Sequence, residues 1–434
     1  MKNTDHSLFR LVRRATCCVI FCLLAQQAWA QPKGFNYDES KVPDFELPEL
    51  LTAADGTRIE TPAQWNDIRR PEILALFEEH VFGQAPPQLD QLRYRIRSEH
   101  PAALDGRAIR REITVFFSDD DAGPQMDILV YTPAAAVEPV PCFLGLNFKG
   151  NHTIEADPAL HLPTIYGPGD KGPAVSTPAD ATRGTRSNRW PVAMIVEQGF
   201  GLATIYYGDI DPDFHDDFHN GIHSLWPEQQ GTNRPANAGG SIAAWSWGLS
   251  RALDVLETDP LVDGNRVAVF GHSRLGKTSL WAGATDPRFR MVISNDSGCG
   301  GAALSRRRFG ETVGRINTVF PHWFCRNHRS FNDNEDALPV DHHMLIALSA
   351  PRTVYVASAE KDQWADPRGE MLSLYYAGPV YELFGRKGLP SSTMPAIDQP
   401  IHTDVGYHIR TGKHDVKDFD WQQYLTIAKT ALSD

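Results

Sequence analysis

The chain has 434 residues, of which 41% are hydrophobic and 22% are charged, a composition typical of soluble globular proteins. Its formal net charge is −12, and no run of lysine and arginine follows the N-terminus, which argues against a nucleic-acid partner. We find no repeat, low-complexity linker or domain boundary, so we expect one catalytic domain over residues 31–434.

The first thirty residues have the features of a secretory signal peptide. A basic start precedes an apolar stretch from Ala15 to Ala25, which is too short to span a bilayer. Ala28-Trp29-Ala30 then has the small-x-small pattern of a cleavage site. We expect cleavage after Ala30, a secreted or periplasmic protein, and no membrane segment once the signal is removed.

Three cysteines leave with the signal, and Cys142, Cys299 and Cys325 remain. Export implies an oxidising compartment, which favours a disulfide, and Cys299 with Cys325 is the pair that we favour. Cys142 lies inside an apolar strand, where a buried free thiol is the expected state. The sequence does not decide whether the favoured pair is bridged.

The first third of the mature chain predicts a surface segment, one helix and several strands. Residues 31–61 are rich in proline and acidic residues and are expected to wrap the surface. Helical apolar spacing follows over Trp65 to Phe82. We expect antiparallel strands over Leu92–Ile96, Ile109–Phe117 and Met126–Tyr131. Val140 to Phe148 is a continuous apolar run, and hydrolases place a second oxyanion donor on a loop such as the one that follows it.

Strands and helices alternate from residue 140 onward. This order predicts a three-layer α/β fold with a mostly parallel central sheet and helices on both faces. The remaining expected strands are Gly201–Tyr207, Phe289–Ser294, Arg352–Ser358 and Val405–Arg410. The expected helices are Pro191–Phe200, Ser241–Leu256, Glu370–Phe384 and Trp421–Leu432.

A long loop between residues 208 and 240 carries many metal-ligating side chains. They are Asp209, Asp211, Asp213, His215, Asp216, Asp217, His219 and His223. No H-E-x-x-H or EF-hand spacing is present among them. We therefore expect a polar loop at the edge of a cleft rather than a metal site.

The stretch from Arg266 to Lys277 organises the rest of the chain. An apolar strand runs to Phe270, a tight turn carries Ser273, and a helix follows. An α/β-hydrolase presents its nucleophile on such a strand-to-helix turn, and Gly271 avoids crowding of the turning backbone. The free N–H groups at the start of the helix can receive an oxyanion.

The same stretch also matches the phosphate loop of nucleotide-binding proteins. Gly271 to Thr278 spells G-x-x-x-x-G-K-T, and Leu275 stands where the second glycine of G-x-S-x-G is expected. The motif alone does not separate the two interpretations. Export argues against the phosphate loop, because nucleoside triphosphates are scarce outside the cytoplasm.

A nucleophilic serine needs a base and an acid that orients the base. His414 follows the last expected strand, where the base belongs, whereas His408 lies within that strand and is expected to be packed. Two acids follow earlier strands, Asp296 and Asp362. Active sites form at such strand ends, but spacing alone leaves open which acid serves.

Several segments together resemble one family. Gly271 to Lys277 resembles the G-C-S-R-x-G-K signature of the glucuronoyl esterases, carbohydrate esterase family 15. Further segments similar to bacterial members are Arg70–Leu74, Asp296–Ala303, Leu338–His343, Ala350–Arg352 and Gly412–Asp415. His272 departs from the cysteine of the fungal signature.

The resemblance implies a serine esterase that cleaves the ester between 4-O-methyl-glucuronic acid of glucuronoxylan and lignin alcohols. No cofactor is needed, and we expect a monomer. Fungal members carry a glutamate at the position of Asp296, and many bacterial members an aspartate at that of Asp362; we expect Asp362 to orient the base and Asp296 to be a second acid. The other implied roles are Ser273 as nucleophile, His414 as base, Arg274 as oxyanion donor, Lys277 and Glu311 as ligands of sugar hydroxyls, and Trp364 as a wall of the uronate pocket.

Without the resemblance, Glu311 would be interpreted as part of a surface ion pair and Trp364 as core packing.

The main enzymatic alternative is an acetyl-xylan or other carbohydrate esterase on the same fold. Arg274 and Lys277 argue against it, because a neutral acetyl ester has less use for two cations. A non-catalytic glycan-binding protein is a further alternative, and the full set of serine, histidine and aspartate argues against it. The alcohol, the xylan length and the choice between periplasm and medium stay open.

Overall fold

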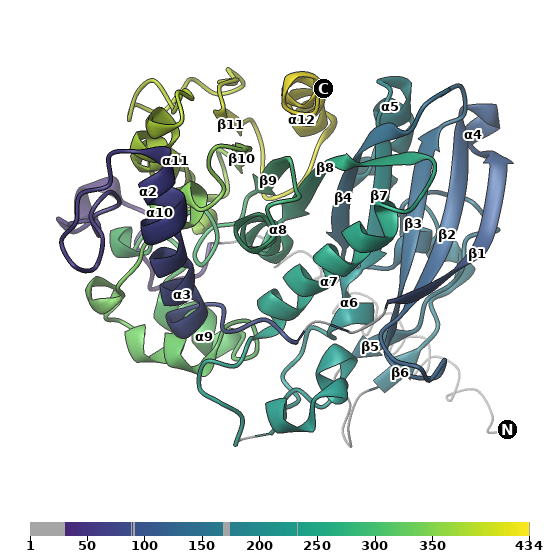
Figure 1. Cartoon of the computed structure of the whole chain (residues 1–434), viewed down its shortest axis with the longest axis horizontal. Coiled ribbons are helices and arrows are strands. Elements are labelled where there is room, and N and C mark those ends of the chain that lie inside the picture. The colour runs from purple at the N-terminus through teal and green to yellow at the C-terminus, as the bar shows by residue number, and fades with distance from the viewer. Residues whose placement is uncertain (1–30, 88, 90–91, 168–173, 232, 434) are drawn as a thin grey trace, which may run out of the picture. The chain divides into compact units, whose positions relative to one another are not determined.

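A nine-stranded sheet runs through the centre of the computed structural model, which describes residues 31–87, 89, 92–167, 174–231 and 233–433 (Figure 1). The strand order is β1-β2-β3-β7-β4-β8-β9-β10-β11. Neighbours from β7 to β11 pair in parallel, and those from β1 to β7 are antiparallel. The expected fold, an α/β-hydrolase with a mostly parallel sheet, is therefore confirmed.

The strands have the following bounds: β1 Arg93–Ala102, β2 Ala108–Phe116, β3 Gln125–Pro133, β4 Val140–Asn147, β7 Gly201–Tyr206, β8 Val262–His272, β9 Met291–Asn295, β10 Thr353–Ala359 and β11 Val405–Arg410. A separate small hairpin consists of β5 Ile165–Gly167 and β6 Ala174–Ser176. The helices are α2 Pro62–Gln64, α3 Arg70–His80, α4 Ala103–Gly106, α5 Val192–Glu197, α6 Tyr207–Ile210, α7 Ser241–Leu256, α8 Arg274–Thr285, α9 Val313–Val319, α10 His342–Ala347, α11 Pro367–Leu383 and α12 Asp418–Ala431.

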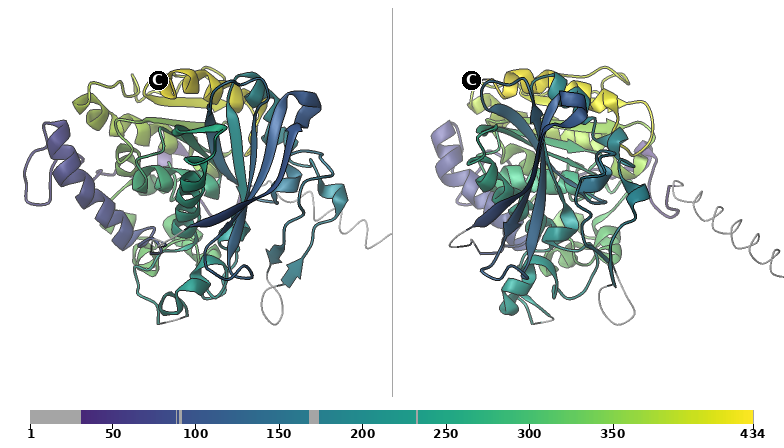
Figure 2. Two further views of the ribbon diagram at one scale, coloured as in Figure 1. Left: turned by 45° about the vertical axis from the view of Figure 1, so that its right-hand side comes forward. Right: turned by 90° about the vertical axis from the view of Figure 1, so that its right-hand side faces the viewer.

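Two hydrophobic cores lie on the two faces of the sheet, and alternate residues of each central strand supply them. In β8, Val267 and Val269 belong to one core, and Ala268 and Phe270 belong to the other. Helices α3, α7, α8, α10 and α11 pack into the first core, and α5 and α12 into the second. Figure 2 shows helices on both sides of the sheet. Burial of both faces explains why the central strands have continuous apolar sequences.

The expected helix over Trp65 to Phe82 is correct in place but interrupted. A π-helical turn occupies Trp65–Arg69, and the regular helix α3 begins only at Arg70. Pro71 gives the reason, because its ring would clash with the carbonyl of residue 67 in a regular α-helix. The N–H of Arg70 instead bonds the carbonyl of Trp65, which widens the turn.

The edge of the sheet and several short elements differ from expectation. The edge strand β1 runs to Ala102, well beyond the expected end at Ile96, because residues of its second half pair with β2 through polar contacts such as Glu99 with Arg111. Tyr94 and Ile96 of β1 are exposed. Helices α9 and α10 and the hairpin were not expected, since each is too short to show periodicity.

The favoured disulfide between Cys299 and Cys325 is wrong. Cys142, Cys299 and Cys325 are all free and buried. The Sγ atom of Cys325 is directed to the carbonyl oxygen of Glu79, 3.7 Å away, and burial raises the pKa of both favoured thiols. They behave as small apolar side chains, and spacing in the sequence could not reveal this.

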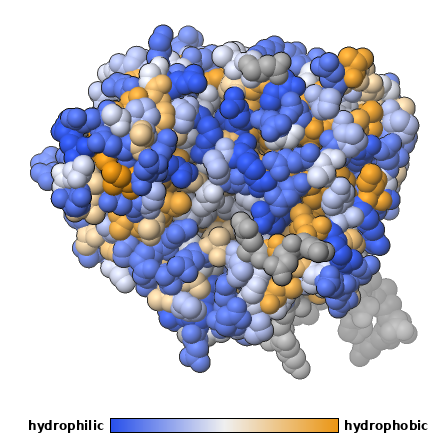
Figure 3. All heavy atoms as spheres, viewed as in Figure 1, coloured by the Kyte–Doolittle hydropathy of each residue, from blue (hydrophilic) through white to orange (hydrophobic). Residues whose placement is uncertain are grey.

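Residues Asn36–Asp434 form one compact unit. Hydrophilic side chains cover much of the face shown in Figure 3, with hydrophobic residues interspersed among them. Among the described residues, no helix has both the length and the apolar character needed to cross a membrane. The expected signal peptide, residues 1–30, lies outside the described part of the chain.

Candidate active site

Ser273 occupies a strained turn between β8 and α8. Its φ of 60° and ψ of −128° are rare for a residue with a side chain, and such strain is typical of functional sites. A Cβ atom on Gly271 would lie 1.8 Å from the carbonyl oxygen of Leu275, so only glycine fits there. The N–H of Ser273 donates to the carbonyl of Asn295 at 2.8 Å. This is the geometry of a nucleophile elbow.

The displaced second glycine of the motif also has a packing reason. A Cβ atom on Gly276 would lie 3.0 Å from both the Oγ of Ser294 and the Cβ of Ser297. Gly276 thus lets α8 approach the end of β9 closely, while the buried Leu275 belongs to a hydrophobic core. Both glycines of the phosphate-loop pattern, Gly271 and Gly276, thus have packing roles in this turn.

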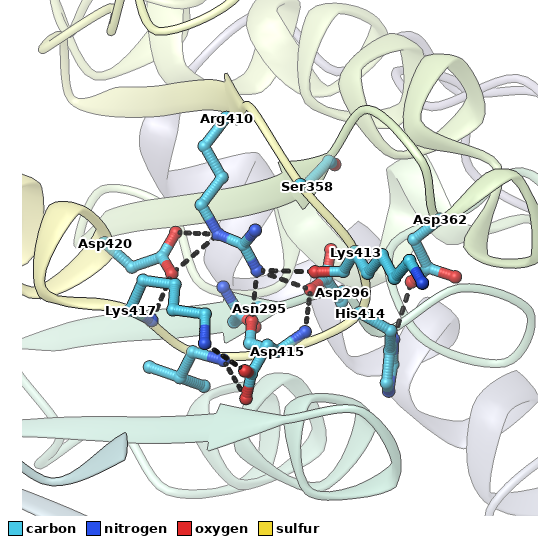
Figure 4. Close-up of polar contacts among 12 residues, drawn as sticks. Asn295, Asp296, Ser358, Asp362, Arg410, Lys413, His414, Asp415, Lys417 and Asp420 are labelled. Atoms are coloured by element: carbon cyan, nitrogen blue, oxygen red, sulfur yellow. Dashed lines mark hydrogen bonds and ion pairs between the residues drawn. The ribbon is translucent and has the colours of Figure 1, made fainter. Parts of the chain in front are cut away.

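His414 and Asp362 lie together at the carboxyl ends of β11 and β10 (Figure 4). The Nδ1 atom of His414 lies 2.6 Å from Oδ2 of Asp362. The side chain of Asp362 is buried, whereas that of His414 is 27% exposed. This arrangement can fix the tautomer of the imidazole, in which Nδ1 carries the hydrogen and Nε2 is the basic atom.

Asp296 is close to this pair but has different partners. Its Oδ2 atom accepts from the N–H of Asp415 at 3.3 Å and from Arg410 at 3.5 Å. One ligand atom from each of Asp296, Asp362 and His414 lies within 4.8 Å of the others. Burial raises the pKa of Asp296 well above its usual range, and the carboxylate of Asp362 adds to the shift although Arg410 opposes it. Asp296 can therefore hold a proton.

These three side chains are also the group of described residues with the spacing of a metal site. A cation is disfavoured there for two reasons. Asp362 and His414 are already paired with each other, and the guanidinium of Arg410 faces Asp296. An ion would have to break the pair and approach a fixed positive charge.

Arg410 supports the loop that carries His414. Its guanidinium binds both oxygens of Asp420, at 2.8 and 3.0 Å. The same group donates to the carbonyl of Lys413 at 3.0 Å and also to that of Asp415. Figure 4 shows Arg410 between Asp420 and this loop. A buried ion pair between Arg410 and Asp420 thus supports the loop that carries His414.

His272 packs against the proposed base. Its ring centroid lies 4.5 Å from that of His414. Its Nδ1 atom lies 2.6 Å from Oδ1 of Asn295, whose amide nitrogen donates to Tyr424. Burial lowers the pKa of His272 well below its usual range, and His414 adds to the effect, so the ring is neutral. His408, in contrast, is fully buried between Tyr355 and Asp420 and is a packed residue, as expected.

Arg274 lies in a group of aromatic rings next to Ser273. Its guanidinium carbon lies 4.7 Å from the ring centre of Trp323, 5.5 Å from that of Phe320 and 5.6 Å from that of Phe148. It forms an ion pair with Asp213, one of the acids of the loop over residues 208–240. Asp216 of the same loop accepts from Asn220. These acids therefore have protein partners.

The loop after β4 was expected to carry a second oxyanion donor, but two of its N–H groups are already bonded within the loop. The N–H groups of Lys149 and Gly150 both donate to Oδ1 of Asn147, at 3.3 and 2.8 Å. These two donors are directed inward, so they are not free to receive an oxyanion. The loop instead brings Phe148 to Arg274.

Glu311 lies near both Lys277 and Trp364. The Nζ atom of the buried Lys277 donates to the carbonyl of Ser297, and burial lowers its pKa although Glu311 opposes the shift. The N–H of Glu311 donates to the carbonyl of Trp364 at 3.0 Å. Burial raises the pKa of Glu311, and Lys277 opposes this shift. A cation, an acid and a half-buried indole are suited to hold a sugar ring.

Tyr37 was missed by the sequence analysis. Its ring centroid lies 6.5 Å from that of Trp364, and burial followed by the charges of Glu311 and Asp362 raises its pKa to about 12. The segment expected to wrap the surface therefore contributes a side chain near the site. Nothing in its local sequence marks this residue, because its partners lie far along the chain.

Comparison with known proteins gives the family. A family profile described as "Glucuronyl esterase, fungi" matches residues 232–385. A glucuronoyl esterase structure from Solibacter usitatus is 47% identical, with a TM-score of 0.87 over 91% of this chain and 100% of that one. The chain belongs to the glucuronoyl esterases, carbohydrate esterase family 15. A promiscuous esterase of this family from the marine bacterial metagenome is also 47% identical, with a TM-score of 0.85 over 92% of this chain and 100% of that one. A 4-O-methyl-glucuronoyl methylesterase of Wolfiporia cocos is 28% identical over 81% of this chain and 74% of its own length.

Other family-like segments of this glucuronoyl esterase hold the fold together. Arg70 donates to the carbonyl of Ala284, in the last turn of α8, and to that of Leu348, directly after α10. Arg352 donates to the carbonyl of Gly283 at 2.6 Å. Asp341 accepts from the N–H of Ser305 and caps α10. These charges satisfy backbone groups, so their resemblance to the family reflects structure rather than chemistry.

Proposed function

We propose that this protein is a serine esterase that hydrolyses the ester between (4-O-methyl-)glucuronic acid of glucuronoxylan and lignin alcohols. The observation that carries the proposal is 47% identity, over nine-tenths of the chain, to a glucuronoyl esterase. The serine on a strained elbow and the 2.6 Å contact between His414 and Asp362 support a catalytic role for the same residues.

In the proposed reaction, Oγ of Ser273 attacks the ester carbonyl carbon while Nε2 of His414 takes the hydroxyl proton. Asp362 accepts a hydrogen bond from the N–H at Nδ1 of His414 and stabilises the imidazolium. The tetrahedral oxyanion is held by the guanidinium of Arg274 and by an N–H at the start of α8. Collapse expels the alcohol, which receives the proton from His414. Water then enters, loses a proton to His414 and attacks the acyl carbon. The bond from that carbon to Oγ of Ser273 breaks, Oγ takes the proton back from His414, and glucuronic acid leaves.

The proposed sugar pocket consists of Lys277, Glu311 and Trp364. Lys277 uses one proton on the carbonyl of Ser297 and keeps two for a sugar hydroxyl. Glu311 can accept from the diol, and Trp364 can pack on the ring face. Asp296 is proposed as a second acid, because one of its carboxylate oxygens lies within 4.8 Å of the polar atoms of Asp362 and His414.

The test is hydrolysis of benzyl glucuronate beside a simple acetyl ester, with wild type and Ser273→Ala. We expect strong preference for the glucuronate and loss of both activities in the variant. Preference for the acetyl ester would contradict the uronate assignment and leave the serine mechanism intact. Activity retained in Ser273→Ala would contradict the mechanism.

A second candidate, broader carbohydrate esterase activity, is favoured by one observation. The 47% identical marine relative is described as promiscuous. Measurable acetyl-ester turnover at a lower kcat/KM than that for glucuronate would support such breadth in this protein too.

We further propose that residues 1–30 direct export, that residues 31–434 act as a single catalytic domain, and that the mature protein is a monomer. Basic, apolar and small-residue segments in order support the signal. Mass spectrometry of the exported protein would locate the cleavage site, expected after Ala30. Light scattering would test the monomer.

A further inference from the structure

Asp213 comes from a loop far from Ser273 in sequence, yet it contacts the residue directly after the nucleophile. The ion pair joins Oδ2 of Asp213 to Nη1 of Arg274. Arg274 is partly exposed, at 27%, whereas the side chain of Asp213 is only 9% exposed. The acid therefore lies on the inner side of the guanidinium, and the open side is left for a ligand.

Asp213 is itself rigidly held by three further donors. Its Oδ1 atom lies 2.7 Å from Nε1 of Trp323 and 2.9 Å from Nε2 of His322. The hydroxyl of Tyr207 donates to its Oδ2 atom at 3.0 Å. Although burial raises the pKa of Asp213, the His322 hydrogen bond and the charge of Arg274 outweigh it and leave the pKa well below its usual range. The carboxylate is charged and has no freedom to turn.

The aromatic rings around Arg274 cannot replace this anchor. Attraction between a cation and a ring face holds the guanidinium at a distance from the ring but does not fix its rotation within its own plane. Hydrogen bonds to a fixed carboxylate do. Trp323 serves both purposes, because its ring lies under Arg274 while its N–H holds Asp213. Cation, ring and acid thus form one connected unit.

We propose that Asp213 is a positioning residue that fixes the guanidinium of Arg274 in the orientation that receives the oxyanion. The inference rests on the proposed function, in which Arg274 stabilises the tetrahedral intermediate. An oxyanion donor contributes most when it needs no reorganisation during the reaction. The loop over residues 208–240, which the sequence predicts to be a polar loop at the edge of a cleft, would thereby contribute to stabilisation of the transition state.

A double-mutant cycle tests this inference. The variants are Asp213→Ala, Arg274→Ala and the pair together, with kcat and KM measured on benzyl glucuronate. We expect Arg274→Ala to lower kcat by about 10²–10³-fold, as loss of an oxyanion donor does. Asp213→Ala should lower kcat by about 10²-fold with little change in KM, the effect of misplacing a catalytic group by about 1 Å. The double variant should match Arg274→Ala, because Asp213 acts only through Arg274.

A merely structural role predicts a different outcome. The two kcat losses would then multiply, or Asp213→Ala would leave kcat at the wild-type value; either result overturns the inference. Asp217→Asn, on the same loop, is the control and should keep wild-type kcat, since Asp217 contacts only His215 among the ion pairs of described residues. If Asp213→Ala does not fold, the cycle is run with Asp213→Asn, which keeps the shape and removes the charge.

Failure of the proposed function can be separated from failure of the inference. If the wild type hydrolyses another ester and not the glucuronate, the cycle is run on that ester, because the oxyanion is common to both. Coupling between the two residues then decides the inference independently of the substrate.

Discussion

The Nδ1 atom of His414 lies 2.6 Å from Asp362, whereas Asp296 is bonded to Arg410 and to the N–H of Asp415. Both acids follow strands, and spacing in the sequence left the choice between them open. The contact favours Asp362 as the acid that orients the base. The raised pKa of Asp296 agrees, because a protonated carboxyl would stabilise an imidazolium poorly.

Asp362→Asn is therefore expected to lower kcat on benzyl glucuronate by about 10⁴-fold, since the wrong tautomer of His414 would be stabilised. Asp296→Asn should lower it by about tenfold or less. Circular dichroism should show that both variants are folded. Equal losses, or a larger loss for Asp296→Asn, would reverse the assignment.

The elements that could be predicted to the residue are those with a strong apolar pattern. Ser241–Leu256 and Val405–Arg410 match α7 and β11 in both bounds. The second half of β1 could not be predicted, because a polar edge strand has no pattern of burial. For the site, the motif and the order of the strands were sufficient to predict that Ser273, His414 and the two acids lie at one end of the sheet.

The partners of Arg274 illustrate what sequence could not provide. Asp213 precedes Arg274 by 61 residues. Trp323, whose ring packs on Arg274, lies after α9. A contact between such distant positions leaves no local signal, so the sequence predicts for Asp213 only a place in a polar loop at the edge of a cleft. Tyr37 was missed for the same reason.

Asp420→Ala is expected to destabilise the protein strongly. Asp420 is fully buried and binds Arg410 through both oxygens, so its removal leaves a buried guanidinium without its main partner. Breaking such a pair costs about 3–5 kcal/mol. Urea unfolding followed by fluorescence would measure the change.

The matched control is Asp418→Ala, in the first turn of the same helix α12 but exposed. Its loss should cost less than about 1 kcal/mol, through the helix dipole alone. Similar midpoints of urea unfolding for the two variants would show that the ion pair with Arg410 contributes little to stability.

Reducing agents are expected to leave stability unchanged. The thiols of Cys142, Cys299 and Cys325 are free and buried, so no covalent bond is available for dithiothreitol to break. A thiol reagent should react with none of them in the native mature protein and with all of them after denaturation. A fall in melting temperature on reduction would show that the protein contains a disulfide after all, contrary to the structure.

Glu370 should make stability depend on pH. It is fully buried and accepts from the N–H groups of Ser297 and Gly298 at 2.8 and 2.9 Å and from the hydroxyl of Ser358 at 2.5 Å. Burial raises its pKa from 4.5 to about 7, although the Ser358 hydrogen bond opposes the shift. The folded protein therefore retains a proton between pH 4.5 and about 7 that the unfolded chain releases.

Because the folded state binds more protons in that window, the contribution of Glu370 to stability is complete below pH 4.5 and falls as pH rises to about 7. The loss is about 3 kcal/mol. Glu370→Gln keeps the shape and an accepting oxygen but cannot ionise. Melting temperatures measured from pH 4 to 8 should thus show the wild type losing stability relative to the variant as pH rises, with a constant difference above pH 7. If the melting temperature of the wild type instead rose relative to that of the variant over the same range, Glu370 would be charged in the folded protein and stabilised by its hydrogen-bond donors.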